Sequence, residues 1–279
     1  MQTEHLDRWA AFDQKLKALR AEFAGSNFLF RGQSNDGWGL DTTLERAGYP
    51  GCSLEHYYRV LLRVRPAIEA HTGHRWVLPT PETFRRWVTS YDAVSGLTEW
   101  KGYDFMAYLR HHGFPSPLLD WSRSPYVAAF FAFQPLTGSS DRVAIFVYQE
   151  RAGNMKSHSS GRPQIRQLPE YVRTHARHFR QQCEYTVCLE YRKGGLEEDA
   201  RSGELYNFHY ARHDAVFDKI DFFKVEHAQD QLWKFTVPRI ERAKVMQLLN
   251  DFNLNSYSLF GSEDALMSTL AEKEIRPHA

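Results

Sequence analysis

The sequence lacks several features that would assign it to a class at once. Its 279 residues carry a net charge of only +1, so the chain as a whole gives no electrostatic reason to expect a nucleic-acid binder. The three cysteines are odd in number and lack metal-ligand spacing, which favours free thiols in a reducing compartment. Neither a signal-peptide pattern nor an apolar run of the roughly 20 residues that a bilayer requires is found. We therefore expect a cytoplasmic protein without a membrane span.

Familiar catalytic motifs are missing as well. There is no glycine-rich phosphate loop, no Gly-x-Ser-x-Gly elbow and no set of kinase motifs. Three histidine pairs have spacings that a metal site could use: His111/His112, His175/His178 and His209/His213. No cysteine or carboxylate pair completes a recognisable ligand set around them. We expect no metal.

The stretch of the chain with the most structural signals is residues 104–133. A helical pattern begins after the polar cap Asp104 and stops at Gly113. A short apolar run follows, and Ser124 with the next proline supplies a strong helix start. The helix after it is apolar on all sides and is therefore expected to be buried. Asp120 and Ser122 thus lie on a tight connection between two buried segments, where polar groups need partners or a ligand.

Strand patterns surround this stretch. They predict strands near 27–33, 118–121, 142–149, 184–190 and 231–237, and helices that include 4–24, 53–71 and 262–271. In the first strand Arg31 shares a face with Leu29, so its guanidinium is expected at the mouth of a core, against an anion. Gly32 would let a ligand come close. On spacing alone, an ordinary strand-end arginine with a surface partner is the favoured explanation.

A locally basic segment covers residues 164–182. It carries four arginines and two histidines, and it precedes the strand that begins near 184. Such a segment can face phosphates. A solvated helix face is the more common explanation of the same pattern.

The tripeptide Phe30-Arg31-Gly32 and the later run LRHHGFPSPLLDWSRSPYVAAFFAF together resemble the FRG domain family, which is named for that tripeptide. The resemblance extends over about residues 26–271. It departs from the family pattern at Arg110, where glutamine is usual, and at Ser116 and Ser122, where threonine is usual. It implies one FRG domain at 26–279, with an N-terminal helix at 1–25 and a helical insertion at about 71–103.

A weaker resemblance connects the chain to ADP-ribosyltransferases of the Arg–Ser–Glu class. Arg31 with its glycine on a first strand, Ser122 at the end of a second, and Gln182-x-Glu184 opening a later strand occur in the order of that class. The third match has an alternative, because the FRG family usually shows Gln-x-Gly-x-Phe there, which aligns with Gln181 instead. The resemblance implies an α+β fold with a split antiparallel sheet around a cleft, helices outside, and NAD as substrate.

The same resemblance implies roles for individual residues. Glu184 would stabilise the oxocarbenium-like state that forms when the nicotinamide–ribose bond breaks, Arg31 would hold the pyrophosphate, and Ser122 would brace them. The NAD site would also include these residues: Gly32, Gln33, His112, Asp120, Tyr126 and Gln182.

We therefore expect an NAD-consuming ADP-ribosyltransferase that acts as a toxin or anti-phage defence effector. Its acceptor would be nucleic acid, RNA or DNA, or else a protein, and a toxin would need a cognate inhibitor as a partner. Two alternatives stay open. One is a non-catalytic binding module in which Arg31, His112 and Asp120 form a structural network. The other is a nuclease that uses His111, His112 and Asp120.

Overall fold

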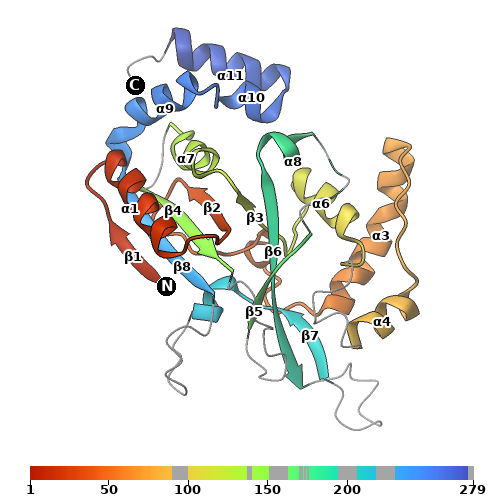
Figure 1. Ribbon diagram of the computed structural model, residues 1–279. Coiled ribbons are helices and arrows are strands. Elements are labelled where there is room, and N and C mark those ends of the chain that lie inside the picture. The colour runs from red at the N-terminus through yellow and green to blue at the C-terminus, as the bar shows by residue number, and fades with distance from the viewer. Residues whose placement is uncertain are drawn as a thin grey trace, which may run out of the picture.

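The computed structural model describes residues 1–89, 100–136, 140–150, 163–169, 172, 174, 176–193, 206–217 and 230–275. Within these ranges the chain forms one eight-stranded sheet with helices packed around it (Figure 1). The strands are β1 (Gln2–His5), β2 (Phe28–Gln33), β3 (Leu119–Ser122), β4 (Arg142–Gln149), β5 (Gln164–Gln167), β6 (Cys183–Lys193), β7 (Tyr206–Tyr210) and β8 (Gln231–Pro238). The helices and strands confirm the expected α+β class with a mostly antiparallel sheet.

The strand order is β1-β8-β4-β2-β3-β6-β5, and β7 pairs with β6. All pairs are antiparallel except β1 with β8. Pairing is weakest in the centre, because β2 and β3 share a single register pair, Phe30 with Ser122. On either side of that junction β2 pairs with β4 along its whole length, and β3 pairs with β6 along its whole length. The sheet therefore consists of two continuous halves joined at one point.

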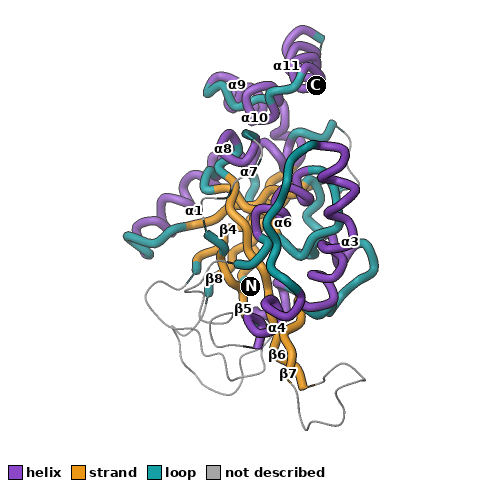
Figure 2. Tube along the Cα trace, turned by 90° about the vertical axis from the view of Figure 1, so that its right-hand side faces the viewer, coloured by secondary structure: helices purple, strands orange, loops and turns teal. Residues whose placement is uncertain are grey.

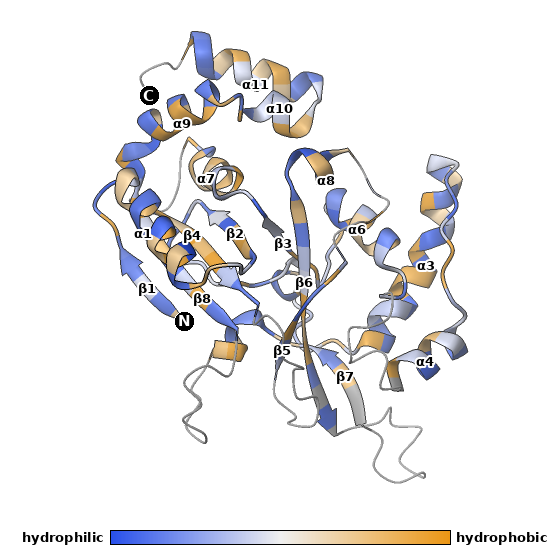
Figure 3. Ribbon diagram, in the orientation of Figure 1, coloured by the Kyte–Doolittle hydropathy of each residue, from blue (hydrophilic) through white to orange (hydrophobic). Residues whose placement is uncertain are grey.

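The half that contains β2, β4 and β8 is covered by α1 (Trp9–Glu22), α7 (Pro125–Phe133) and α9 (Arg242–Asp251). The apolar character of α7 is visible along its length in Figure 3. Ser124 caps this helix by accepting a hydrogen bond from the Val127 amide, as the sequence predicts. Gly32 allows the close contact of β2 with α7, since a Cβ at Gly32 would overlap the carbonyl oxygen of Ala128.

The other half is covered by α3 (Leu54–Thr72), α4 (Pro81–Thr89) and α6 (Tyr103–His111). Aromatic rings join these helices, with Tyr58 stacked on Phe84 at 3.7 Å between centroids. Figure 2 shows the strands in the middle of the molecule, with α1 on one side and α3 on the other. The remaining helices are short or C-terminal: α2 (Thr43–Arg46), α8 (Arg177–Arg180), η2 (His213–Phe217), η3 (Arg239–Glu241), α10 (Ser256–Phe260) and α11 (Glu263–Glu274).

Three local predictions are wrong. The N-terminal helix begins at Trp9, not at residue 4, and residues 2–5 form the edge strand β1. β1, with the sequence QTEH, carries no apolar alternation, and β5, with QIRQ, has one apolar residue, so neither shows a strand pattern. Gly102 in the left-handed conformation, not Asp104, precedes the first turn of α6.

The proposed helical insertion at 71–103 is only partly described. It contains the end of α3, all of α4 and the start of α6, while residues 90–99 lie outside the described ranges. None of the helices in the described part of the chain combines the length and the apolar character that a membrane crossing requires.

Candidate functional site

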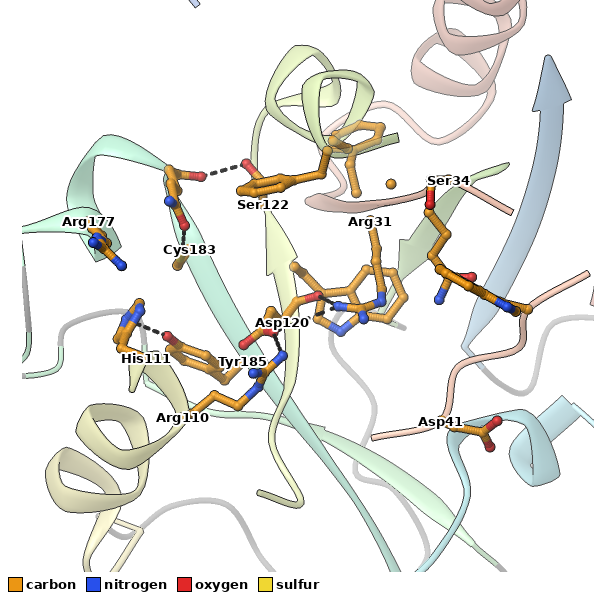
Figure 4. Close-up of a pocket in the computed structure, with 18 of the residues that line it drawn as sticks. Arg31, Ser34, Asp41, Arg110, His111, Asp120, Ser122, Arg177, Cys183 and Tyr185 are labelled. Atoms are coloured by element: carbon orange, nitrogen blue, oxygen red, sulfur yellow. Dashed lines mark hydrogen bonds and ion pairs between the residues drawn. The ribbon is translucent and has the colours of Figure 1, made fainter. Parts of the chain in front are cut away.

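A pocket of about 710 Å³ is lined by residues of β2, β3, β6 and α7, on both sides of the central junction (Figure 4). Its charged and polar lining consists of Arg31, Gln33, Ser34, Asp41, Arg46, Arg110, His111, Asp120, Ser122, Arg177, Gln181, Cys183 and Tyr185. Aromatic rings of Trp38, Phe131 and Phe260 complete it. The junction thus places residues distant in sequence around one cavity.

Arg31 lies inside this pocket and is largely enclosed, with 14% of its side chain exposed. One terminal nitrogen donates to the carbonyl oxygen of Asp120 at 2.7 Å and lies 3.9 Å from the Asp120 carboxylate. Burial lowers the pKa of Arg31 to about 10, against the opposing effect of Asp120, so the guanidinium stays charged at neutral pH. Its Nε is buried without a hydrogen-bond partner among the described residues. That donor can serve a ligand.

Asp120 also forms an ion pair with Arg110 of α6. The carboxylate therefore lies between two guanidiniums, as Figure 4 shows. The Nε of Arg110 is, like that of Arg31, buried and unpaired within the described ranges. One carboxylate holds two cations at fixed positions, and a net positive charge remains for an anionic ligand.

Ser122 lines the pocket where β3 ends. Its hydroxyl donates to the carbonyl oxygen of Gln181 at 2.8 Å and accepts from the Ser124 amide at 3.0 Å. It thereby ties the end of β3 to the turn that opens β6. The single donor and one acceptor lone pair of the hydroxyl are used within the fold, so its clearest role is to position that turn.

The wall opposite Arg31 is built by β6 and α6. Tyr185 shares a hydrogen bond of 2.8 Å with the Nε2 of His111, and burial strongly raises the pKa of Tyr185. The phenol therefore stays protonated. Cys183 lies on the same strand, and burial also raises the pKa of its thiol, so it is not a reactive thiolate.

Glu184 does not line this pocket. In β6 its side chain points to the face opposite to Cys183 and Tyr185, because successive residues of a strand alternate. The side chain is 1% exposed and pairs with Arg123, whose Nε lies 2.6 Å from one carboxylate oxygen. The convergence of Arg31, Ser122 and Glu184 that the sequence predicts is therefore met only by the first two.

Of the other predicted site residues, some line the pocket and others do not. Gln33 lines the pocket and donates to the carbonyl oxygen of Gly39 at 2.8 Å. His112, Tyr126 and Gln182 are not among its lining residues. His112 is exposed after α6, so it does not belong to a buried network with Arg31 and Asp120. Of the two alignments of the third motif, the one through Gln181 reaches the pocket.

Sequence reasoning missed Arg46, Arg110, Arg177 and Trp38 as lining residues. Only Arg110 carried a signal, because it replaces the glutamine that the FRG pattern usually has. Arg177 belongs to the basic segment 164–182, whereas nothing in the local sequence marks Arg46 and Trp38, which reach the pocket through the fold. As for metals, the described residues contain no cluster of three or more histidine, cysteine, aspartate or glutamate side chains placed to hold an ion.

Comparison with known families gives one match. Residues 26–140 match the FRG domain family, which confirms the resemblance of the central motif. This stretch of the chain is similar to the FRG domain. The matched range supplies Arg31, Arg110, Asp120 and Ser122 to the pocket, whereas the wall formed by β6 lies beyond it. Neither a curated protein nor a solved structure matches the chain. An FRG domain match brings no activity with it, so function has to be argued from the pocket.

Proposed function

We propose that the pocket beside the FRG motif binds NAD and that the protein is an NAD-consuming ADP-ribosyltransferase. The observation that carries the proposal is the enclosed pair Arg31 and Ser122 on neighbouring strands, within a pocket rich in guanidinium groups. The strands that bear the three transferase-like motifs, β2, β3 and β6, are consecutive neighbours in the sheet. An antiparallel sheet that is almost split at the β2–β3 junction is also what that resemblance implies.

Charge favours a ligand with a pyrophosphate. Four arginines and two aspartates line the pocket, an excess of two positive charges. A pyrophosphate carries about two negative charges at neutral pH, and arginine forks suit phosphate oxygens. The unpaired Nε atoms of Arg31 and Arg110 are the buried donors that such a ligand would satisfy.

Size and aromatic content favour a nucleotide. A cavity of about 710 Å³ lies within the usual range for sites that hold cofactor-sized molecules. Trp38 is 54% exposed at the rim, and Phe131 and Phe260 lie on the wall. These rings offer stacking surfaces for an adenine or a nicotinamide.

In the proposed reaction the acceptor nucleophile forms a bond to the ribose C1′, while the nicotinamide leaves with the electrons of the broken bond. The positive charge that develops on the ribose needs a nearby carboxylate. Asp120 is the pocket carboxylate suited to this role, in place of Glu184. Arg31 and Arg110 would hold both the carboxylate and the pyrophosphate in position. A role as toxin or defence effector, with an inhibitor as partner, rests on the resemblance alone.

A second candidate is a nucleotide-binding module without catalysis. It is favoured by the sealed position of Glu184 and by the two arginines that already hold Asp120. Such a module would bind the same ligand in the same pocket but leave its glycosidic bond intact.

The test is binding and turnover with Arg31→Lys. We expect the parent to bind NAD by calorimetry and to transfer label from NAD to a component of cell lysate, identified by separate nuclease and protease treatment. Lysine cannot reproduce the guanidinium fork, so binding and transfer should each fall by about 10²-fold. Arg59→Lys, on α3 and 48% exposed, is the matched control and should behave like the parent. NAD binding without any transfer would favour the module, and no NAD binding would remove both candidates.

A further inference from the structure

One aromatic side chain beside the pocket, that of Phe179, is exposed to solvent. Phe179 of α8 is 61% exposed, between Arg177 and Arg180, while His178 of the same turn is buried. A large ring held in solvent between two arginines gains nothing from burial in this fold. An exposed ring flanked by arginines offers a stacking face to an aromatic ligand and charge to its phosphates.

The position of α8 connects this ring to the pocket. Arg177 lines the pocket, and its guanidinium lies 5.5 Å from the ring centre of Phe260, another lining residue. Arg180 lies against Gly261, where a side chain would collide with its guanidinium. α8 therefore forms part of the rim, with Arg177 turned toward the pocket and with Phe179 and Arg180 exposed.

Two further arginines lie beyond α8, and one of them, Arg123, is paired with Glu184. The turn after this helix is joined to β3, since the Arg123 amide donates to the carbonyl oxygen of Gln182 at 3.0 Å. Arg123 and Arg20 line a second cavity of about 410 Å³ near the start of β2. Arginines thus extend from the first pocket, over α8, to the second.

Three acidic side chains of the described residues bear on the charge of this rim. Glu184 is paired with Arg123 and fully enclosed. Glu263 and Asp264 begin α11 shortly after Gly261, but no ion pair joins either of them to Arg180 within the described part of the chain. Within the described residues, Arg180 therefore adds a positive charge to the rim although the whole chain is nearly neutral.

We propose that this rim, defined by Arg177, Phe179 and Arg180, binds single-stranded nucleic acid, with a base stacked on Phe179 and phosphates on the arginines. Unpaired bases offer an open face to an aromatic ring, and the flexible backbone can follow the arginines from one cavity to the other. A duplex hides those faces. The proposal that nucleic acid binds is argued from the rim residues alone. The further proposal that the bound nucleic acid is the acceptor of ADP-ribose rests on the proposed function.

Fluorescence anisotropy tests the binding with labelled oligonucleotides of about 12 residues, a length within the usual site sizes. The probes are oligo(dT), oligo(U) and a mixed-sequence duplex. We expect both single strands to bind, the stronger of the two identifying DNA or RNA as the preferred ligand, and the duplex to bind at least tenfold more weakly. Affinity should fall with salt, and Arg180→Ala should reduce the log–log slope by about 0.7.

Phe179→Ala should weaken single-strand binding by about tenfold or more, the scale for removing one stacking platform. Phe252→Ala is the matched control, because Phe252 is 59% exposed but is not flanked by arginines. NAD binding, measured by calorimetry, should be unchanged in Phe179→Ala, since this ring does not line the pocket.

Three outcomes would overturn the proposal: no binding of either single strand, equal losses in Phe179→Ala and Phe252→Ala, or a preference for the duplex. Capture of a protein by this surface without oligonucleotide binding would overturn it as well. If the strands bind as expected but NAD does not bind, the rim proposal stands and the transferase proposal fails.

Discussion

Asp120 and Glu184 are carboxylates on neighbouring strands, and both are paired with arginine, but their surroundings differ. The Asp120 side chain is 31% exposed, and it faces the pocket between Arg31 and Arg110. The Glu184 side chain is 1% exposed and has its arginine, Arg123, between it and solvent. The same chemical pair is available to a ligand in one place and closed to it in the other.

Strand alternation explains the difference. Asp120 pairs in register with Tyr185, and Glu184 pairs with Trp121, so the two carboxylates occupy opposite faces of the β3–β6 ladder. A shift of one residue exchanges the faces of a strand. The comparison teaches that a carboxylate in the right strand of the right sheet is not yet a site residue; its position within the alternation decides whether a ligand can reach it.

The largest expected effect is a loss of stability when the ion pair between Arg123 and the buried Glu184 is broken. Arg123→Met leaves the buried Glu184 carboxylate without its cation, and we expect a loss of about 3 kcal/mol, the lower end for breaking a buried pair, because Gln167 still lies 3.5 Å from that carboxylate. Urea unfolding measures the loss.

Arg59→Met is the control for this loss of stability. Arg59 is 48% exposed, similar to the 43% of Arg123, but its partner Glu55 keeps a second ion pair with Arg85 at 2.8 Å, so the loss in Arg59→Met should stay below about 1 kcal/mol. Equal losses in the two variants would mean that Glu184 is not held by Arg123 in the folded protein.

The next effect concerns activity and separates the two carboxylates directly. In the transferase proposal, Asp120→Asn should reduce turnover of NAD by about 10²-fold to 10³-fold, since it removes the charge that faces the ribose. Glu184→Gln should keep turnover within about threefold of the parent, because its carboxylate lies outside the pocket. Single-turnover rates, measured well below each variant's melting temperature, distinguish the two. A large loss in Glu184→Gln alone would return the catalytic role to Glu184.

Much of the fold could be predicted because its central strands carry strong patterns. β4 and β8 are rich in apolar and β-branched residues, and both were placed within one residue of their observed bounds. The start of α7 could be predicted from Ser124 and the proline that follows it. β1 and β5 were not predicted, because edge strands need no apolar face and their pairing is fixed by partners that are distant in sequence.

The site was predictable only in part, for a related reason. Arg31 and Asp120 could be predicted from local context, since each polar group adjoins a buried segment. The face that Glu184 occupies depends on the register of β6 against β3, which Gln181, Gln182 and their neighbours leave ambiguous by one residue. Arg46 and Arg177 reach the pocket from elements whose local sequences also suit ordinary solvated surface.

The smallest expected effect concerns two buried polar residues, Thr186 and His213. Thr186, two residues after Glu184, accepts from the Trp121 indole at 2.8 Å and shares a hydrogen bond of 2.9 Å with the Nε2 of His213. His213 is fully buried, and burial together with the charge of Arg31 lowers its pKa to about 3. The lowered pKa keeps His213 neutral at pH 7, so its Nε2 can accept from the Thr186 hydroxyl.

The pH dependence of stability tests this arrangement. The unfolded chain protonates this histidine below about pH 6.5, whereas the folded protein does so only near pH 3, so stability is fully present above pH 6.5 and falls as the pH is lowered between these values. At pH 5 the loss should be about 2 kcal/mol relative to pH 7.5, measured by urea unfolding. His213→Asn should flatten this part of the profile whatever its absolute stability, while His71→Asn, at an exposed position, should leave the slope unchanged. An unaltered slope in His213→Asn would show that other groups cause the acid sensitivity and that the residues behind Asp120 and Glu184 do not couple to pH.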